Sequence, residues 1–281
     1  MILIADSGST KTAWICTDGT TQETYVTSGA NPFFRSTADM IAEWRESRLS
    51  LLRDKVSHVY FYAAGVVNQE KAQVIEKALL KLFPGATASV QSDLLAAAHA
   101  TLGNNSGIAC ILGTGSNSCL YNGKEITAHV PPLGFILGDE GSGAVLGRLL
   151  VGDYLKKTMP AELSRLFKDK YPYEYSDFLN RVYKQEKPNM FLASLVPFLK
   201  ENIGHAYCSN LVKNAFDLFI TRNVARYDAY QEQDICFAGS VAYHFQEQLK
   251  WVLNERNLRP GKIIKEPLLN LMEYHLKQPI Q

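Results

Sequence analysis

The chain has 281 residues, 46% of them hydrophobic, and a formal net charge of +1, which is typical of a globular protein with one large or two medium domains. A net charge so close to zero gives no bulk electrostatic support for binding nucleic acid or a membrane surface. No apolar run reaches the roughly 18 residues of a membrane-spanning helix. We therefore expect neither nucleic acid nor a membrane as a partner.

The compartment is predicted from the cysteines and the N-terminus. The five cysteines are scattered without the spacing of a metal site, which fits a reducing compartment. The N-terminus runs straight into a predicted strand, without the basic region of a signal peptide. We expect a cytoplasmic protein.

The chain opens with a strand, a turn of small residues and a second strand. Apolar residues 2–5 end at Asp6, the string SGSTKT follows, and residues 13–16 are again apolar, which predicts a hairpin. It differs from a P-loop, because no glycine precedes Lys11 and no helical pattern follows it. Such a turn exposes N–H groups that can cradle a phosphate, and Asp6 could hold a metal ion through water. An ordinary hairpin is the alternative for this segment alone.

The rest of the first domain alternates strands and helices. We expect strands at residues 20–27, 56–63 and 87–90, and helices at residues 37–55, 69–83 and 93–102. The order βββαβαβα places this domain in the α/β class. The loop at residues 103–107 is the predicted boundary, so we expect a first domain over residues 1–106 and a second over residues 107–281.

The second domain begins with the same pattern as the first. An apolar strand at residues 108–112 enters the small-residue turn GTGSN, and a strand at residues 118–121 follows, closed by Asn122-Gly123, a strong hairpin signal. Two such segments predict two related halves. Their opposed hairpins would grip the β- and γ-phosphates of a nucleotide from both sides.

A long helical region follows in the second domain. After a glycine-rich loop at residues 134–143 we expect helices at residues 144–158, 176–185, 190–202 and 209–228. A buried strand at residues 234–238 then precedes a helix at residues 240–257, a strand at 261–265 and a helix at 268–277.

Three further positions could carry chemistry. Asp93 follows a strand and opens a helix, so it is either a helix N-cap or a general base at the ligand-binding end of the sheet. Asp139 and Glu140 lie between glycines ahead of a helix; the helix dipole would stabilise Glu140, while Asp139 could face a ligand. Gly239 allows a close backbone approach, which suits an adenosine or a tightly packed turn.

Five blocks together carry a family resemblance. The strings DSGSTKT, SDLLAAAHA, ILGTGSN, GDEGSG and CFAGSVA, in this order, resemble the N-acetylglucosamine kinase branch of the BadF/BadG/BcrA/BcrD ATPase family. That family belongs to the actin–hexokinase–Hsp70 superfamily. The resemblance implies two ribonuclease-H-like, actin-like ATPase domains with an active-site cleft between them, and ATP and Mg²⁺ as cofactors.

The resemblance also implies roles for individual residues. Nucleotide and metal binding fall to Asp6, which holds the metal, and to Ser9, Thr10, Lys11, Gly113, Thr114, Gly115, Gly239 and Ser240. Sugar binding falls to Asn31, Ser116, Asn117 and Asp139, with Asp93 as the general base. The chain departs from the animal enzymes at one loop, where Pro132-Leu133-Gly134 replaces Gly-Trp-Gly; we expect Leu133 and Gly134 to border the sugar without the aromatic platform.

The leading hypothesis is an ATP-dependent kinase that phosphorylates the C6 hydroxyl of an amino sugar. The candidate sugars are N-acetylglucosamine, N-acetylmuramic acid and glucosamine, and the sequence leaves open which one is used and whether the chain forms a homodimer. One alternative is an ATPase that activates a 2-hydroxyacyl-CoA dehydratase, a role that needs cluster-binding cysteines at a dimer interface. Another is a non-catalytic actin-like nucleotide switch.

Overall fold

The structure is a computed structural model that describes residues 1–8 and 10–278. The chain divides into two compact units. Unit 1 contains Met1–Asn104 and the C-terminal segment from Glu266 onward, and unit 2 contains Asn105–Lys265. The boundary near residue 105 lies close to the expected one. The C-terminal segment, which the sequence placed in the second domain, instead belongs to unit 1.

Unit 1 is built on a five-stranded sheet of order β3-β2-β1-β4-β5. The strands are β1 (Ile2–Ser7), β2 (Lys11–Thr17), β3 (Gln22–Ser28), β4 (His58–Ala63) and β5 (Thr87–Ser92). β1 and β2 form the expected antiparallel hairpin, whereas β1, β4 and β5 run parallel. Ser7, Ala63 and Ser92 share one row across the parallel strands. Asp6 and Asp93 therefore lie at the same edge of this sheet.

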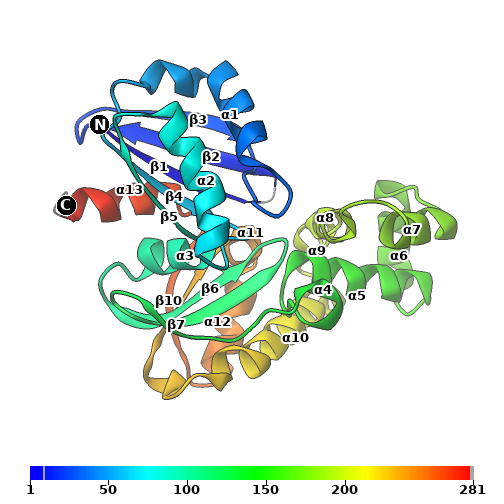
Figure 1. The fold of residues 1–281 in the computed structure, drawn as a ribbon. Coiled ribbons are helices and arrows are strands. Elements are labelled where there is room, and N and C mark those ends of the chain that lie inside the picture. Colours follow the sequence, from blue (N-terminus) through cyan, green and yellow to red (C-terminus); the bar gives the residue numbers. More distant parts are fainter. Residues whose placement is uncertain (9, 279–281) are drawn as a thin grey trace. The chain divides into compact units, whose positions relative to one another are not determined.

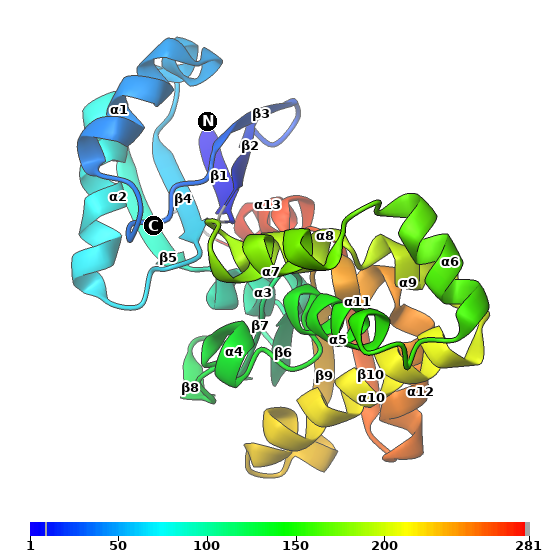
Figure 2. The ribbon, with the colours of Figure 1, turned by 90° about the vertical axis from the view of Figure 1, so that its right-hand side faces the viewer.

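Helices cover both faces of this sheet. α1 (Thr37–Glu46) and α2 (Gln69–Leu82) lie on one side, and α3 (Asp93–Thr101) and α13 (Leu268–Lys277) pack together on the other (Figure 1, Figure 2). The expected helix at residues 37–55 ends at Glu46, because Ser47 takes an extended backbone and its hydroxyl accepts from the Leu49 N–H to start a short 3₁₀ helix, Arg48–Leu52. Trp14, Trp44 and Phe61 form the centre of the core, with ring centroids 5.1–6.0 Å apart.

Unit 2 repeats the topology of unit 1. Its sheet has the order β10-β9-β6-β7-β8, formed by β6 (Ser106–Leu112), β7 (Ser116–Asn122), β8 (Ile126–His129), β9 (Asp234–Ala238) and β10 (Arg259–Ile264). β6 and β7 form the second hairpin, and β6, β9 and β10 run parallel. The α/β class and the two related halves are thereby confirmed.

The helices of unit 2 are more numerous than those of unit 1. They are α4 (Gly134–Leu137), α5 (Gly143–Leu155), α6 (Ala161–Lys170), α7 (Tyr175–Tyr183), α8 (Pro188–Ser194), α9 (Pro197–Glu201), α10 (Ala206–Arg222), α11 (Ser240–His244) and α12 (Gln246–Glu255). Two short 3₁₀ turns, Val224–Arg226 and Tyr230–Glu232, follow α10. Helix α8 packs against α5 and α7, and α5 and α9 also contact α10 (Figure 2).

Three differences from the expected helices have local causes. The expected helix at residues 190–202 is divided into α8 and α9, because Pro197 has no N–H to continue the first helix and instead starts the second. The expected helix at residues 240–257 is interrupted at Phe245, whose backbone leaves the helical region. Helix α6 was not expected; its two buried positions, Leu163 and Phe167, are spaced one helical turn apart.

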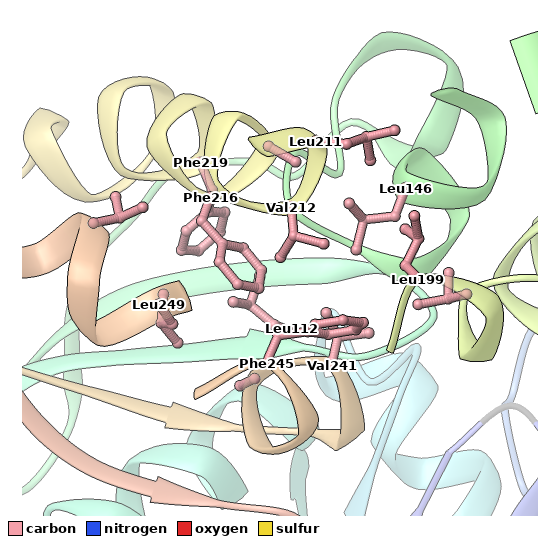
Figure 3. Close-up of a cluster of buried hydrophobic side chains, with 14 of the residues drawn as sticks. Leu112, Leu146, Leu199, Leu211, Val212, Phe216, Phe219, Val241, Phe245 and Leu249 are labelled. Carbon is pink, nitrogen blue, oxygen red and sulfur yellow. The ribbon is translucent and has the colours of Figure 1, made fainter. Parts of the chain in front are cut away.

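The core of unit 2 lies between its sheet and helices α10 and α12. Phe216 and Phe219 of α10 and Leu249 of α12 join one buried cluster with Leu112 at the end of β6 (Figure 3). The cluster anchors β6 where the second small-residue turn begins. Within the described residues, no helix is both long and apolar enough to cross a lipid bilayer.

Candidate active site

The first small-residue turn connects β1 to β2 and presents Lys11. The Gly8 N–H donates to the Lys11 carbonyl oxygen at 3.0 Å, and the Gly29 N–H donates to the Thr10 carbonyl oxygen at 2.9 Å. The Lys11 ammonium lies 3.2 Å from Glu266 Oε1, and both side chains are 60% exposed. An exposed pair of this kind is weak, so Lys11 remains available for an anionic ligand. Ser9 lies outside the described residues.

The second small-residue turn connects β6 to β7 and is tied to the start of α5. The first two amides of α5, at Gly143 and Ala144, donate to the Gly113 and Thr114 carbonyl oxygens at 2.8 and 3.0 Å. A Cβ at Gly143 would lie 3.1 Å from Ala193 Cβ and 3.2 Å from the Gly113 oxygen. This position therefore favours glycine, which lets the helix end approach the turn closely.

Gly239 lies against the same turn. Its φ is +121°, and a Cβ there would lie 2.3 Å from the Leu112 carbonyl oxygen. The backbone between β9 and α11 thus packs directly on the end of β6, an approach that only glycine permits. Of the two interpretations of Gly239, an adenosine contact or a tightly packed turn, this geometry supports the tightly packed turn.

One cavity of about 520 Å³ joins these elements within unit 2. Gly113 and Thr114 from the second turn, and Ser240 after Gly239, line it. An apolar wall from α8, α9 and α11 completes it: Met190, Ala193, Val196, Pro197, Val241 and Phe245. Lys200, Glu201 and His244 also border the cavity. Sequence reasoning grouped the turn with Ser240 but missed the α8–α9 wall, for which no local motif gives a signal.

Two carboxylates lie together in unit 1. Burial raises the pKa of Asp6 to about 7, with the negative charges of Asp93 and Glu266 adding to the shift and Lys11 opposing it. A carboxylate whose neighbours are also negative favours a bound cation, so Asp6 fits a magnesium ion held through water. In the described part of the chain, no three His, Cys, Asp or Glu side chains are arranged to bind a metal directly.

Asp93 is not the N-cap of its helix. Ser92 takes that position, and its hydroxyl accepts from the Leu95 N–H at 3.2 Å. The N-cap interpretation of Asp93 is therefore wrong: α3 is capped without it. Burial raises the pKa of the Asp93 carboxyl above its ordinary value, which moves it toward the range where a carboxylate is an effective base.

Asn31 is oriented by the loop that follows β3. Its Oδ1 accepts from the Phe33 N–H at 3.0 Å. Gly65, with φ +86°, packs against the same side chain, since a Cβ there would lie 2.5 Å from Asn31 Oδ1.

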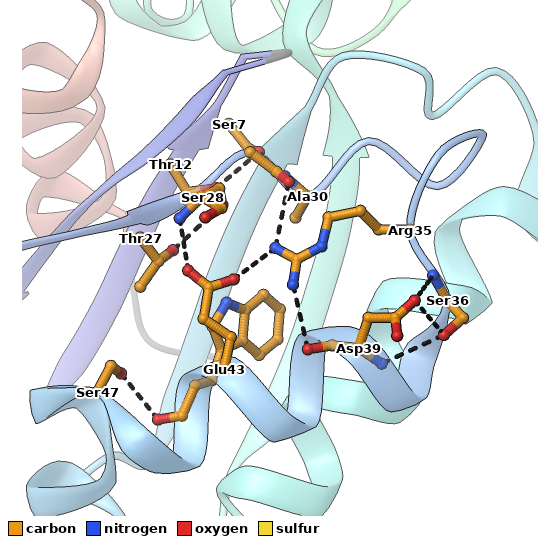
Figure 4. Close-up of polar contacts among 12 residues, drawn as sticks. Ser7, Thr12, Thr27, Ser28, Ala30, Arg35, Ser36, Asp39, Glu43 and Ser47 are labelled. Atoms are coloured by element: carbon orange, nitrogen blue, oxygen red, sulfur yellow. Dashed lines mark hydrogen bonds and ion pairs between the residues drawn. The ribbon is translucent and has the colours of Figure 1, made fainter.

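Polar contacts around this loop fasten it to the sheet (Figure 4). The Ala30 N–H donates to Ser7 Oγ at 2.9 Å. Glu43 of α1 accepts from the Ser28 N–H at 2.7 Å and pairs with Arg35 at 2.6 Å. The loop that carries Asn31 is therefore fixed at both ends.

Asp139 contacts the second turn. Its Oδ1 accepts from the Ser116 N–H at 3.3 Å, and a Cβ at Gly115 would lie 3.2 Å from its Oδ2. Its backbone is left-handed, with φ +51°, and its N–H donates to the Pro132 carbonyl oxygen at 2.8 Å. Burial raises the pKa of Asp139 to about 6, the Glu140 charge adds to this, and the Ser116 N–H opposes it.

Glu140 is held by α10, a connection that sequence reasoning missed. Its side chain is only 7% exposed and lies 2.9 Å from the Arg222 guanidinium. The Asn223 side-chain amide donates to its second oxygen at 3.1 Å. The neighbouring strained Asp139 is thereby anchored from the far side, by residues more than eighty positions later in the chain.

The remaining predicted sugar residues lie on β7 and in the loop that follows β8. Asn117 Oδ1 accepts from the Ser118 N–H at 3.0 Å, and His129 Nε2 lies 2.9 Å from the same atom. Leu133 has φ +63° and is 58% exposed, and Gly134 has φ +72°. The structure thus brings Gly115, Ser116 and Asp139 into contact, while Leu133 projects toward solvent.

No protein-family model and no curated protein matches this chain. The solved structures give clear relatives. A proposed N-acetylglucosamine kinase from Porphyromonas gingivalis is 42% identical, with a TM-score of 0.94 and 98% of each chain covered. A second proposed N-acetylglucosamine kinase, from Chromobacterium violaceum, is 18% identical, with a TM-score of 0.66 and coverage of 97% of this chain and 98% of that one.

A proposed N-acetylmannosamine kinase from Listeria monocytogenes is 14% identical, with a TM-score of 0.54 and 98% of each chain covered. These last two likenesses concern the fold alone. The first is close enough in sequence, over nearly the whole length, to show kinship. The chain belongs to the N-acetylglucosamine kinase-like family represented by this relative.

Proposed function

We propose that this protein is an ATP-dependent kinase that transfers the γ-phosphoryl group to the C6 hydroxyl of an amino sugar, with N-acetylglucosamine as the first candidate. The observation that carries the proposal is Asp93: a half-buried carboxylate with a raised pKa at the carboxyl end of β5, where Ser92 and not Asp93 is the helix N-cap. The relative that is 42% identical is itself a proposed N-acetylglucosamine kinase, which supports the choice of sugar.

Asp93 would act as the general base. It would accept the proton of the C6 hydroxyl as the oxygen attacks the γ-phosphorus, and the bond to the β-phosphate oxygen would break. A raised pKa suits this role, because the conjugate acid must hold the proton while the carboxylate form still dominates at the operating pH.

The phosphates would be held by backbone N–H groups of the two turns and by Lys11. The Gly113 N–H donates to the Gly115 carbonyl oxygen at 2.9 Å, so the geometry of the second turn is set before a ligand arrives. Next to Lys11, the Gly8 N–H donates to the Lys11 carbonyl oxygen at 3.0 Å. Magnesium, when bound near Asp6, would neutralise charge on the transferring group. The Lys11 ammonium would exchange its exposed contact with Glu266 for a phosphate oxygen.

The adenosine would occupy the cavity of unit 2. Its volume of about 520 Å³ is in the range of small-molecule sites, which are mostly apolar with a few polar groups. Thr114 would lie at its phosphate end, and the apolar side chains of α8 and α11 would contact the base. Gly239 supports this role indirectly, because it allows the turn before Ser240 to pack tightly under the cavity.

Asn31, Ser116, Asn117 and Asp139 would bind the sugar hydroxyls. Asn31 and Asn117 each use Oδ1 for an internal hydrogen bond, so each would offer its NH₂ group to the sugar. Asp139 would accept from a hydroxyl, which its ionised form does best. The burial that raises its pKa strengthens such a bond.

The test is a screen of ADP release with ATP and Mg²⁺ across N-acetylglucosamine, N-acetylmuramic acid, glucosamine, N-acetylmannosamine and glucose. We expect the highest kcat/KM with an amino sugar, and ³¹P NMR should place the product phosphate at C6. Phosphate at C1, or turnover with unmodified hexoses only, would overturn the proposal. ATP hydrolysis that no sugar accelerates would favour the nucleotide-switch alternative.

A further inference from the structure

The side-chain amide of Asn117 is held from β8 by a residue outside every motif of the sequence. His129, the last residue of β8, lies with Nε2 2.9 Å from Asn117 Oδ1. In the β7–β8 register His129 pairs with Cys119, two residues along from Asn117. Residues two apart on a strand share one face, so the two side chains are diagonal neighbours across the ladder.

The hydrogen bonds assign the atoms without ambiguity. The Ser118 N–H donates to the same Asn117 atom at 3.0 Å, and a backbone N–H can only meet an acceptor. That atom is therefore the amide oxygen, and His129 Nε2 must carry a hydrogen to approach it. Neutral histidine supplies this hydrogen in one tautomer, and the charged form supplies it always.

With its oxygen fixed by two donors, the Asn117 amide has a defined orientation. Its Nδ2 group has no acceptor among the residues that the structure describes. Rotation of the amide by 180° would set its NH₂ group against the Ser118 N–H and the His129 N–H, leaving three donors facing one another. These two donors thus fix the orientation of the amide, with its NH₂ group turned away from the Ser118 N–H and the His129 ring.

We propose that His129 is a positioning residue for the acceptor sugar, acting through Asn117. It holds the Asn117 NH₂ group as a donor toward a hydroxyl or carbonyl oxygen of the sugar; this rests on the sugar-kinase function proposed above. Preorganisation of this kind lowers the cost of ordering a polar group on binding. Its loss therefore weakens binding of the sugar and leaves binding of ATP unchanged.

The kinetic test compares His129→Gln with His129→Leu, using N-acetylglucosamine and ATP. Glutamine can place an amide N–H where Nε2 lies, whereas leucine fills space without a donor. We expect His129→Leu to raise KM for the sugar roughly two- to tenfold, the range of one hydrogen bond. KM for ATP should stay unchanged, and His129→Gln should recover most of the loss. Thr127→Val, on the same strand, serves as the control and should keep both constants.

Three kinetic results would overturn the inference. The first is a sugar KM that stays at the wild-type value in His129→Leu. The second is a His129→Gln variant as defective as His129→Leu, and the third is an equal change in KM for sugar and ATP, since either would mean that the ring only supports β8.

A measurement without substrate separates this inference from the proposed function. Long-range ¹H–¹⁵N NMR should find His129 in the Nε2–H tautomer near neutral pH, and the Asn117 NH₂ resonances should move in His129→Leu but little in His129→Gln. An Nδ1–H tautomer would refute the positioning role even in an active kinase. If His129 has the expected tautomer but the protein phosphorylates no sugar, the proposed function is refuted and the His129–Asn117 hydrogen bond still stands.

Discussion

The two units share one sheet order but use the same topological positions differently. In both, a hairpin with a small-residue turn leads into parallel strands: β1–β2 in unit 1 and β6–β7 in unit 2. After the second parallel strand each unit has a glycine with positive φ, Gly65 in unit 1 and Gly239 in unit 2. Gly65 packs on the Asn31 side chain, whereas Gly239 packs on the backbone of Leu112. One glycine orients a side chain, and the other allows two turns to touch.

The segments between the strands differ most. Unit 1 has α1 and a short 3₁₀ helix between β3 and β4, while unit 2 has α4 to α10 between β8 and β9. The cavity of unit 2 takes its apolar wall from α8 and α9, within that longer segment. The repeated elements thus supply both turns and, in unit 1, Asp6 and Asp93, and the inserted helices supply part of the pocket wall. We infer that the repeat serves phosphoryl transfer and the insertion serves recognition of the nucleotide.

The largest effect is expected at Asp93, which follows β5. Asp93→Asn should lower kcat by about a hundredfold to ten-thousandfold, the usual loss on removing a general base, as measured by ADP release with saturating substrates. The melting temperature should change little, because Ser92 caps the helix. Its counterpart after β10 in unit 2 is Lys265, and Lys265→Met should keep nearly full kcat. A variant Asp93→Asn that melts early but keeps its kcat would contradict the role of base.

The two glycines provide the second test. Gly239→Ala should cost about 2 kcal/mol or more of unfolding free energy, because a Cβ would meet a backbone oxygen at 2.3 Å and the backbone is strained. Gly65→Ala should cost less stability but raise KM for the sugar, because the clash falls on Asn31. Urea unfolding and sugar KM distinguish the two. Gly152→Ala is the control, since nothing lies within 4 Å of its Cβ position. If Gly65→Ala and Gly239→Ala changed the unfolding free energy and the sugar KM by equal amounts, the two glycines would not have different roles.

The third test concerns two half-buried carboxylates, Asp6 and Asp139. The pKa of Asp6 is raised from 3.8 to about 7, so the folded state holds the proton more tightly than the unfolded chain. The stability from this group is full below about pH 4 and is lost as the pH rises to about 7. Asp6→Asn should therefore be more stable than wild type at pH 8 and lose that advantage toward pH 4. Asp139→Asn in unit 2 should show the same trend ending near pH 6.

Asp6→Asn should also weaken the dependence of turnover on magnesium, as followed by titrating Mg²⁺ at fixed ATP. The metal neutralises charge on the transferring group, and the variant lacks the carboxylate that would hold it. An unchanged magnesium dependence would reject Asp6 as the metal residue, whatever the stability curves show.

The fourth test concerns two histidines of unit 1, whose pKa values are lowered and whose contribution to stability is therefore lost toward low pH. The Tyr62 hydroxyl lies 2.8 Å from His99 Nδ1 and 2.9 Å from His275 Nε2, which joins α3 to α13. Burial lowers the pKa of His99 to about 4 and that of His275 to about 3. Their contribution is present above about pH 6.5 and is lost as the pH falls toward 3. His275→Gln should flatten the acid side of the stability curve; an unchanged slope would mean that the cluster does not control acid unfolding.

The fold was predictable where the sequence pattern is local. Both hairpins, the parallel strands and most helices follow from apolar runs and turn residues. The C-terminal helix α13 was assigned to the wrong unit, because its apolar face does not show which sheet it covers. Leu271 and His275 are buried against unit 1, a long-range choice that no local pattern records.

The candidate site shows the same division between local features that the sequence predicts and long-range contacts that it does not. Gly113, Thr114 and Gly239 were identified from turn chemistry, and the structure places them at one junction. The partners that hold the site residues were missed: Arg222 with Glu140, and His129 with Asn117. These contacts depend on strand register and helix packing. The N-cap of α3 depends on where β5 ends. Because the strand ends at Ser92, Ser92 and not the following Asp93 is the cap.

The smallest effect is expected at Leu133, where a tryptophan would restore the aromatic side chain of the animal enzymes. We predict that the protein accepts N-acetylmuramic acid alongside N-acetylglucosamine, because a trimmed loop leaves room for the lactyl ether at C3. Leu133 is 58% exposed and left-handed, with φ +63°, so its side chain forms no closed wall.

Leu133→Trp should therefore lower kcat/KM for N-acetylmuramic acid more than for N-acetylglucosamine, by about tenfold or less if the clash costs roughly 1 kcal/mol. Leu133→Gly is the matched control: glycine relieves the left-handed strain and should keep or improve turnover of the larger sugar. Steady-state kinetics with both sugars on both variants gives the comparison. Equal losses for the two sugars in Leu133→Trp would mean that this loop does not set the edge of the sugar pocket. A loss confined to the larger sugar would assign acceptor selection in unit 2 to the loop after β8, apart from the turn that we propose to contact phosphate.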